Sequence, residues 1–422
     1  MRKGRQTGRM TETAFSSRQW TFKAIVGDGD NWSRYQAAYA GQVRADQIAE
    51  IEKMLGCGDP AHGYATYICL KCGEQVRVCF SCKSRVCSRC GKGYADAWAQ
   101  ALTQHLFNVP HRHITFTVPA ELWPVLEAHP DWRKVLFGAA NRTLRKVLKA
   151  QPGIVMVLHP YGKDLKVNYH LHVLVTEGGL TKTGDWQNQT YLNYRGLRKI
   201  WQYECLTALR LVMPKTIQTS QIVDRLFTAH RNGFYVYAKP RVTDGHGVSR
   251  YIGRYLRHPA IADARILAYD GTTVTFYYED HDGVRHKQTW PVLAFIHGVV
   301  RHIPPKHFKL VRYFGLYAPR KTTQVQAIVQ QIGRMVGRVI QRLTWRTRIQ
   351  RDFARDPLQC PRCGTPDMEL YSLTIRWRGQ LKTVGGLNWL FRRGVLHETG
   401  VAPPPNSVSQ PIPFAQQLAL GI

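Results

Sequence analysis

The distribution of the cysteines places the strongest constraint on how this chain of 422 residues can fold. Seven of its ten cysteines lie between Cys57 and Cys90, and three Cys-x-x-Cys units follow one another there. The two thiolates of such a unit can face one tetrahedral Zn²⁺ ion. A segment this short and this rich in Gly, Lys and Arg has little apolar surface on which to fold without metal. The pattern therefore predicts zinc rather than a framework of disulfides.

The predicted zinc ligands are these seven cysteines together with one histidine, eight groups that would suit one or two structural zinc ions. They are Cys57, His62, Cys69, Cys72, Cys79, Cys82, Cys87 and Cys90. A further pair, Cys360-x-x-Cys363, is half a site. It is either a zinc knuckle completed elsewhere in the chain or a reduced structural pair.

The charge balance predicts an anionic partner. Lys and Arg number 59 against 28 Asp and Glu, a formal net charge of +31, and nucleic acid is the usual partner of such a chain. Lys83, Arg85 and Arg89 lie between the zinc-block cysteines and would present positive charge to phosphates. The chain has no long apolar span, and its first 20 residues are basic and polar without an apolar stretch, so we expect no membrane contact, no secretory signal and a cytoplasmic location.

Residues 168–175 are predicted to form a β-strand that carries two histidines on one face. Side chains alternate across a strand, so His170 and His172 share a face while the apolar residues between and after them point into a core. Two imidazoles so placed can hold one metal ion. For this motif alone, the simpler interpretation is that two histidines occur in one strand by chance and make ordinary hydrogen bonds.

A third metal ligand is expected from a neighbouring strand. Residues 154–159 read as a strand, and the short connection to residues 168–175 predicts an antiparallel hairpin that places His159 opposite His170. A slip of one residue would send His159 to the other face, so Asp164, Glu177 or a ligand from elsewhere are the alternatives.

Residues 249–259 are predicted to form a helix with two tyrosines on one face. Tyr251 and Tyr255 are four residues apart, and three arginines surround them, Arg250, Arg254 and Arg257. A pair of core tyrosines at this spacing is common and is the alternative. The remaining sequence predicts helices near residues 94–106, 131–150, 194–211 and 219–228, strands at 111–119 and 234–237, and a hairpin within 265–296. Arg112 and His113 could form a second metal site or contact phosphate or solvent.

Several of these stretches together resemble the two-tyrosine HUH transposases of bacterial insertion sequences, the insertion-sequence-91 family, over residues 51–320. The matching stretches are 80–90 in the zinc block, 113–119, Leu158-His159 with 168–172, the tyrosine segment 251–255, and 312–315. The resemblance implies an α+β HUH endonuclease fold, a central antiparallel sheet flanked by helices. It adds an N-terminal zinc-ribbon-like domain and a basic helical C-terminal region.

The resemblance also implies the chemistry. Single-stranded DNA would be nicked and rejoined through a 5′-phosphotyrosine on Tyr251 or Tyr255, assisted by Mg²⁺ or Mn²⁺ on the histidines, in rolling-circle transposition near the bacterial nucleoid. No nucleotide cofactor is expected, because phosphotyrosine stores the phosphodiester energy and no Walker-type glycine loop occurs.

The expected domain organisation follows the chain in order. It comprises a flexible basic arm over residues 1–25, a zinc- and DNA-binding domain over 26–106, the HUH catalytic domain over 107–320, a basic helical region with Cys-x-x-Cys over 321–399, and a Pro-rich disordered tail over 400–422. Two other functions fit parts of the sequence. A plasmid replication initiator or relaxase would use the same chemistry, and a non-catalytic zinc protein that binds nucleic acid would explain the charge and the cysteines.

Overall fold

A five-stranded antiparallel sheet forms the centre of the molecule. The computed structural model describes residues 20–189, 191–238, 260–280, 282–319, 344, 346–347, 349–350, 356–366 and 368–392. The strand order is β12-β4-β5-β3-β8, and each neighbouring pair is antiparallel. The strands are β3 (His111–Thr117), β4 (Gly153–Tyr161), β5 (Val167–Thr176), β8 (Val236–Ala238) and β12 (Val311–Gly315). This is the central antiparallel sheet that the resemblance implied.

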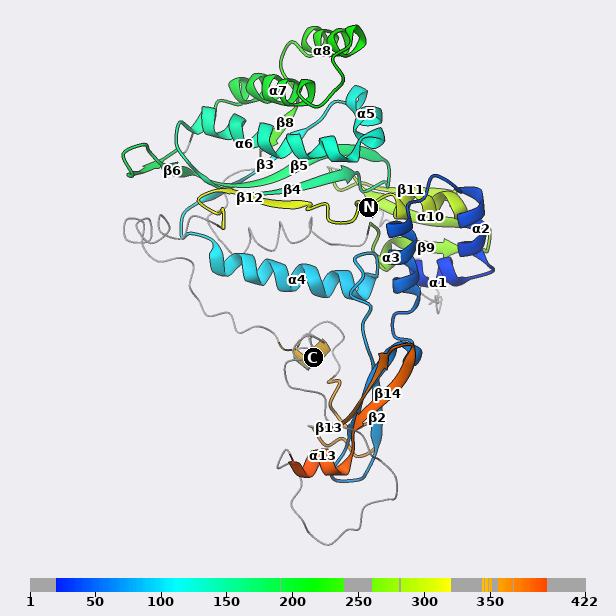
Figure 1. The fold of residues 1–422 in the computed structure, drawn as a ribbon. Helices are drawn as coiled ribbons and strands as arrows, with labels where there is room; N and C mark the ends of the chain where they lie inside the picture. The colour runs from blue at the N-terminus through cyan, green and yellow to red at the C-terminus, as the bar shows by residue number, and fades with distance from the viewer. Residues whose placement is uncertain are drawn as a thin grey trace, which may run out of the picture.

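Helices cover both faces of this sheet (Figure 1). On one face lie α5 (Trp123–Ala128), α6 (Lys134–Leu148), α7 (Tyr194–Arg210) and α8 (Ile217–Ala229), and on the other lies α4 (Ser88–His105). Leu171, Val173 and Val175 of β5 are buried in the core under α6 and α7, as their alternation predicted. Leu174 packs instead with Leu102 of α4. The two histidines of β5 therefore belong to the face that α4 partly covers.

The N-terminal helices share a core with a distant part of the chain. The elements are α1 (Phe22–Gly27), α2 (Asn31–Ala38), α3 (Ala45–Leu55), the three-stranded sheet of β9 (Ile266–Tyr269), β10 (Thr273–Glu279) and β11 (Arg285–Pro291), and α10 (Val292–Val300). The Asn31 side chain donates a hydrogen bond of 2.7 Å to the hydroxyl of Tyr269. The helices at the start of the expected zinc-binding domain, residues 26–106, thus pack against residues of the expected catalytic domain. Phe22 is buried in α1, so a flexible arm cannot extend to residue 25.

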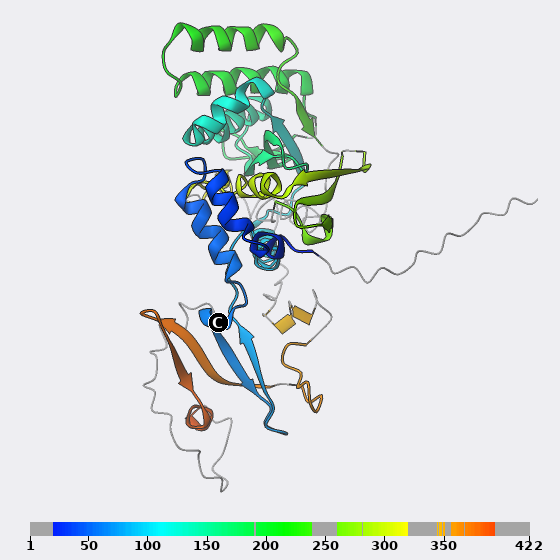
Figure 2. The ribbon, with the colours of Figure 1, turned by 90° about the vertical axis from the view of Figure 1, so that its right-hand side faces the viewer.

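A second sheet is built from the two ends of the chain. Its order is β14-β13-β1-β2, with β1 (Gly63–Ile68), β2 (Gln75–Cys79), β13 (Glu369–Trp377) and β14 (Gln380–Gly385). Figure 2 shows the blue and orange strands side by side. The described part of residues 356–392 is thus mainly a β-hairpin, followed by the short α13 (Leu387–Arg392). Most of residues 321–350, where a basic helix was expected, lies outside the described residues. The tail 400–422 lies outside the described residues.

Short elements complete the described part of the chain. They are β6 (Gly178–Leu180), β7 (Trp186–Asn188), and the 3-10 helices η1 (Pro60–His62), η2 (Ala120–Leu122), η3 (Pro130–Arg133) and η4 (Asp263–Arg265). At the end of β12, Gly315 has φ +58°, and a Cβ there would lie 1.8 Å from the carbonyl oxygen of Pro152. Within the described ranges, no helix combines the length and apolar character needed to cross a membrane.

Candidate active site

Three histidines converge on the face of the central sheet that carries α4. His159 on β4 pairs directly with His170 on β5, so the predicted register is confirmed. The ligand nitrogens of His159, His170 and His172 all lie within 4.8 Å of one another. The Nε2 atoms of His170 and His172 are 3.1 Å apart. Since metal–nitrogen bonds are about 2.1 Å long, both nitrogens could bind one divalent ion.

The two alternative carboxylates are engaged elsewhere. Glu177 is buried and forms an ion pair with Arg112 at 2.5 Å. Asp164 accepts a hydrogen bond from the backbone N–H of Lys166. Among the described residues, His159 is the group that joins the two histidines of β5.

The protein fixes the orientation of the His170 ring. Its Nδ1 lies 2.7 Å from the carbonyl oxygen of Asn168. A carbonyl oxygen can only accept, so Nδ1 carries the proton, and the neutral ring leaves the lone pair of Nε2 for a metal. This is the arrangement that metal-binding histidines require.

A fourth histidine contacts the other ring nitrogen of His172. The Nε2 of buried His113, on β3, lies 3.0 Å from the Nδ1 of His172, and the hydroxyl of Thr115 lies 3.4 Å from the same atom. The sequence suggested a separate metal site or a phosphate contact for His113. That interpretation is wrong because β3 and β5 are neighbours, and Thr115 pairs directly with His172. Alternation in the sequence places His113 and Thr115 on one face of a strand, but it does not specify which strand lies beside them.

The first residues of β3 are part of the buried structure. Arg112 bonds to Glu177 and to the hydroxyl of Tyr194 at 2.8 Å. Burial alone would lower the pKa of Arg112, but these hydrogen bonds outweigh it and raise the pKa. Burial lowers the pKa of His111 to about 4, and its Nε2 lies 2.7 Å from the hydroxyl of Tyr317. Arg112 is therefore not available for phosphate.

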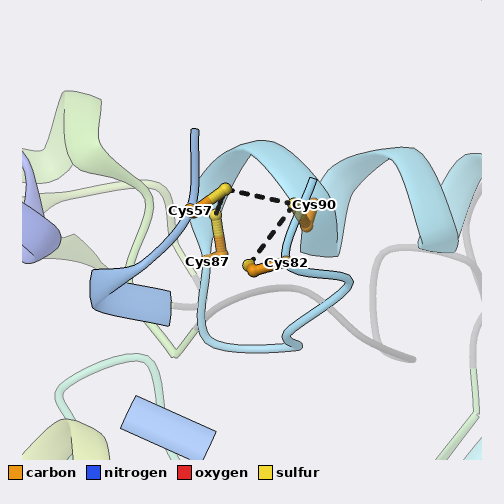
Figure 3. A group of neighbouring side chains, drawn as sticks. All are labelled: Cys57, Cys82, Cys87 and Cys90. Atoms are coloured by element: carbon orange, nitrogen blue, oxygen red, sulfur yellow. Dashed lines mark hydrogen bonds between the residues drawn. The ribbon is translucent and has the colours of Figure 1, made fainter. Parts of the chain in front are cut away.

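One group of four sulfurs joins the end of α3 to the start of α4. Cys57, Cys82, Cys87 and Cys90 converge as Figure 3 shows, with sulfur–sulfur distances of 3.6 and 3.7 Å. Four thiolates at about 2.3 Å from a tetrahedral zinc ion would be about 3.8 Å apart. The exposed side chains of Lys83 and Arg89 and the half-buried Arg85 lie in or beside the loop that these cysteines hold.

A second group of four sulfurs combines Cys69 and Cys72 with Cys360 and Cys363. The predicted ligands His62 and Cys79 belong to neither group, so the eight-ligand set is wrong. The antiparallel register explains Cys79: it pairs with Tyr64 at the start of β1, whereas Cys69 follows the end of that strand. His62 lies in η1 with its ring against Gly56.

The predicted tyrosine segment and its arginines lie outside the described residues, namely Tyr251, Tyr255, Arg250, Arg254 and Arg257.

Comparison with known proteins identifies the family. A family model described as "Putative transposase" matches residues 153–324, and one described as "Transposase zinc-binding domain" matches residues 29–118. The transposase for insertion sequence element IS801 of Pseudomonas savastanoi pv. phaseolicola is 30% identical over 342 residues, which cover 77% of this chain and 83% of that protein. The chain belongs to the insertion-sequence-91 family of transposases.

Two further likenesses were found for this transposase. The protein named "Putative transposase y4qJ" of Sinorhizobium fredii is 26% identical over 80% of this chain and 93% of its own length. The crystal structure of the non-structural protein 1 N-terminal origin-recognition/nickase domain from the emerging human bocavirus covers 54% of this chain and 97% of that chain at 14% identity. The TM-score of this match is 0.23.

Proposed function

We propose that this transposase nicks and rejoins single-stranded DNA at insertion-sequence ends through a 5′-phosphotyrosine, in rolling-circle transposition. Tyr251 and Tyr255 are the proposed nucleophiles, and His159, His170 and His172 are the proposed ligands of a catalytic Mn²⁺ or Mg²⁺. The convergence of these three imidazoles on two central strands is the observation that carries the proposal.

The three histidines suit a divalent ion that must also contact DNA. His172 is buried, whereas His159 and His170 are partly exposed, so phosphate oxygens can approach from the exposed side. An ion bound there would polarise the scissile phosphate and orient it for in-line attack. Three imidazoles suit a transition metal better than Mg²⁺, so we expect Mn²⁺ to activate at lower concentration than Mg²⁺.

The proposed chemistry conserves phosphodiester bonds. The tyrosine oxygen attacks phosphorus, the bond from phosphorus to the 3′ oxygen of the preceding nucleotide breaks, and that oxygen leaves as a 3′ hydroxyl. In the rejoining step, a 3′ hydroxyl attacks the phosphotyrosine and the tyrosine oxygen leaves. A tyrosine hydroxyl has a pKa near 10, so it needs nearby positive charge to react at neutral pH.

Positive charge is also proposed to hold the DNA. Arg250, Arg254 and Arg257 would neutralise the phosphate near the tyrosines. Lys83, Arg85 and Arg89 would contact the backbone from a loop held by a structural zinc ion on the group Cys57, Cys82, Cys87 and Cys90. Affinity would then rest on many contacts and fall steeply with salt.

A covalent-adduct assay tests the proposal. Wild-type protein incubated with Mn²⁺ and an end-derived oligonucleotide labelled at its 3′ end should give a labelled protein band that survives denaturation. The double variant Tyr251→Phe with Tyr255→Phe should give none, since Phe keeps the ring and removes only the nucleophilic oxygen. His170→Ala should also give none while single-stranded DNA binding is largely retained.

The matched control is Tyr237→Phe, an exposed tyrosine of β8 that is not proposed to react. It should form adduct like the wild-type protein. An adduct from the double tyrosine variant would reassign the nucleophile, and undiminished cleavage by His170→Ala would remove the metal site from the chemistry. A protein that only binds nucleic acid would form no adduct under any of these conditions.

A further inference from the structure

The second sulfur group lies between two turns that have the same backbone hydrogen bonds. In the first turn, the N–H of Gly73 donates to the carbonyl of Cys69 at 2.9 Å, and the N–H of Cys69 donates to the carbonyl of Glu74 at 2.8 Å. In the second turn, Gly364 donates to Cys360 at 3.0 Å, and Cys360 donates to Thr365 at 2.9 Å. The spacing is the same in both turns, and so is the role of each glycine.

Both glycines have the left-handed backbone that such a turn needs. Gly73 has φ +75° and Gly364 has φ +70°, a region that residues with a side chain rarely adopt. Each turn therefore presents the two sulfurs of a Cys-x-x-Cys unit toward one point. Two such turns facing each other are what a four-thiolate zinc site is made of.

The sulfur positions fit a metal ion and not a disulfide. The Sγ atoms of Cys69 and Cys363 are 3.6 Å apart, as are those of Cys72 and Cys360. A disulfide would need about 2.05 Å. A tetrahedral zinc ion with bonds of about 2.3 Å would need about 3.8 Å. Cys69 and Cys360 are 2% exposed, and Met368 packs beside them, so the site is closed in the manner of a structural one.

The sheet brings the two turns to the same end of one strand pair. Strands β1 and β13 are antiparallel and pair from Gly63↔Ile375 to Ile68↔Glu369. The first turn directly follows β1 and the second directly precedes β13, so they emerge side by side. Cys72 and Cys360 are 288 residues apart in the chain, and the catalytic sheet lies between them in sequence.

We propose that Cys69, Cys72, Cys360 and Cys363 bind a second structural Zn²⁺ ion, which fastens the C-terminal hairpin to the N-terminal zinc-binding region. Cys360 and Cys363 fall outside both family-model matches, which end at residues 118 and 324. The zinc-binding domain is then completed only by the far end of the chain. This inference does not depend on the strand-cleavage chemistry, because metal content is measured without DNA.

Zinc counting on the full-length chain tests the site. Freshly purified wild-type protein should contain two zinc ions by elemental analysis. The pair Cys69→Ser with Cys72→Ser should lower the count to one, and so should Cys360→Ser with Cys363→Ser. All four substitutions together should also leave one, because both pairs hold the same ion. The matched control Cys79→Ser, at the end of β2, should keep two.

Alkylation of the wild-type protein gives an independent answer if a variant does not fold. With zinc bound, the four cysteines should resist iodoacetamide, and a chelator should make all four reactive at one rate. A count of two in the Cys360 and Cys363 double variant, or a loss of zinc in Cys79→Ser, would overturn the proposal. So would alkylation of Cys360 in zinc-loaded protein whose Cys69 stays protected.

Discussion

His113 should control how tightly the proposed histidine site binds Mn²⁺, although it is not itself a proposed ligand. The Nε2 of His172 faces His170, so the Nδ1 of His172 carries the proton when Nε2 binds metal. That N–H can donate to the Nε2 of His113 at 3.0 Å. His172 is only 7% exposed, so water replaces a lost acceptor poorly. The substitution His113→Phe keeps a ring in the buried position and removes the acceptor.

The expected loss of metal affinity follows from the role of His113, which orients the ring of His172. Removing a partner that orients a metal-binding histidine typically costs about 10- to 100-fold in metal affinity, or about 1.4 to 2.7 kcal/mol. The second contact to His172, from the hydroxyl of Thr115, is longer at 3.4 Å. We therefore expect His113→Phe to weaken Mn²⁺ binding about 10-fold or more, and Thr115→Val to weaken it less.

Isothermal titration of the zinc-loaded protein with Mn²⁺ measures this directly. The Mn²⁺ concentration that gives half-maximal adduct formation should shift by the same factor. Thermal unfolding without Mn²⁺ separates a weakened site from a damaged fold. If folded His113→Phe binds Mn²⁺ as tightly as the wild-type protein, the tautomer argument is refuted.

Three further predictions concern stability. Arg112→Met should lower the free energy of unfolding by about 3 to 5 kcal/mol in denaturant titrations, because it removes the cation that pairs with the buried carboxylate of Glu177. The double variant Arg112→Met with Glu177→Met should recover most of this loss. The pKa of His111 is about 4 in the folded state against about 6.5 in the unfolded state, so the unfolded state binds more protons between these values. Stability should therefore fall as pH decreases from about 6.5 to 4, by up to about 3 kcal/mol from this group, and His111→Gln should show a shallower slope. Gly315→Ala should destabilise by about 2 kcal/mol or more because its Cβ would clash in a left-handed conformation, whereas Gly93→Ala in α4, where space is open, should be neutral or stabilising.

The histidine site was predictable because it depends on alternation and on one short connection. Apolar residues at every second position fixed which face of β5 the histidines share, and the hairpin fixed the partner of His170. The contact from His113 was not predictable in the same way. It depends on β3 lying beside β5, and His113 and His172 are 59 residues apart in the chain. Nothing local in the sequence specifies that neighbour.

The two groups of four cysteines show a different limit. A Cys-x-x-Cys unit specifies its own turn but carries no information about which other unit it faces. Proximity in the sequence favoured grouping Cys79 with Cys82, but Cys79 pairs with Tyr64 and lies outside the group that contains Cys82. In the basic helix α6, Arg142 and Lys146 form ion pairs with the buried carboxylate of Glu204 on α7, so part of the positive charge of this helix is neutralised within the protein.

The hydrophobic core holds the histidine site in register. Ile154, Met156 and Leu158 of β4 alternate with the metal-facing positions and are at most 1% exposed beneath the helices. A slip of one residue would turn these three side chains to the metal-facing side and send His159 into the core. Val155 and Val157 on that side are equally buried against α4, so the slip would exchange one buried apolar set for another. Its cost is the repacking of both faces and the burial of the His159 imidazole without a hydrogen-bond partner, which alone costs about 1 to 3 kcal/mol. Apolar residues that are not proposed to contact metal or DNA therefore fix the position of His159.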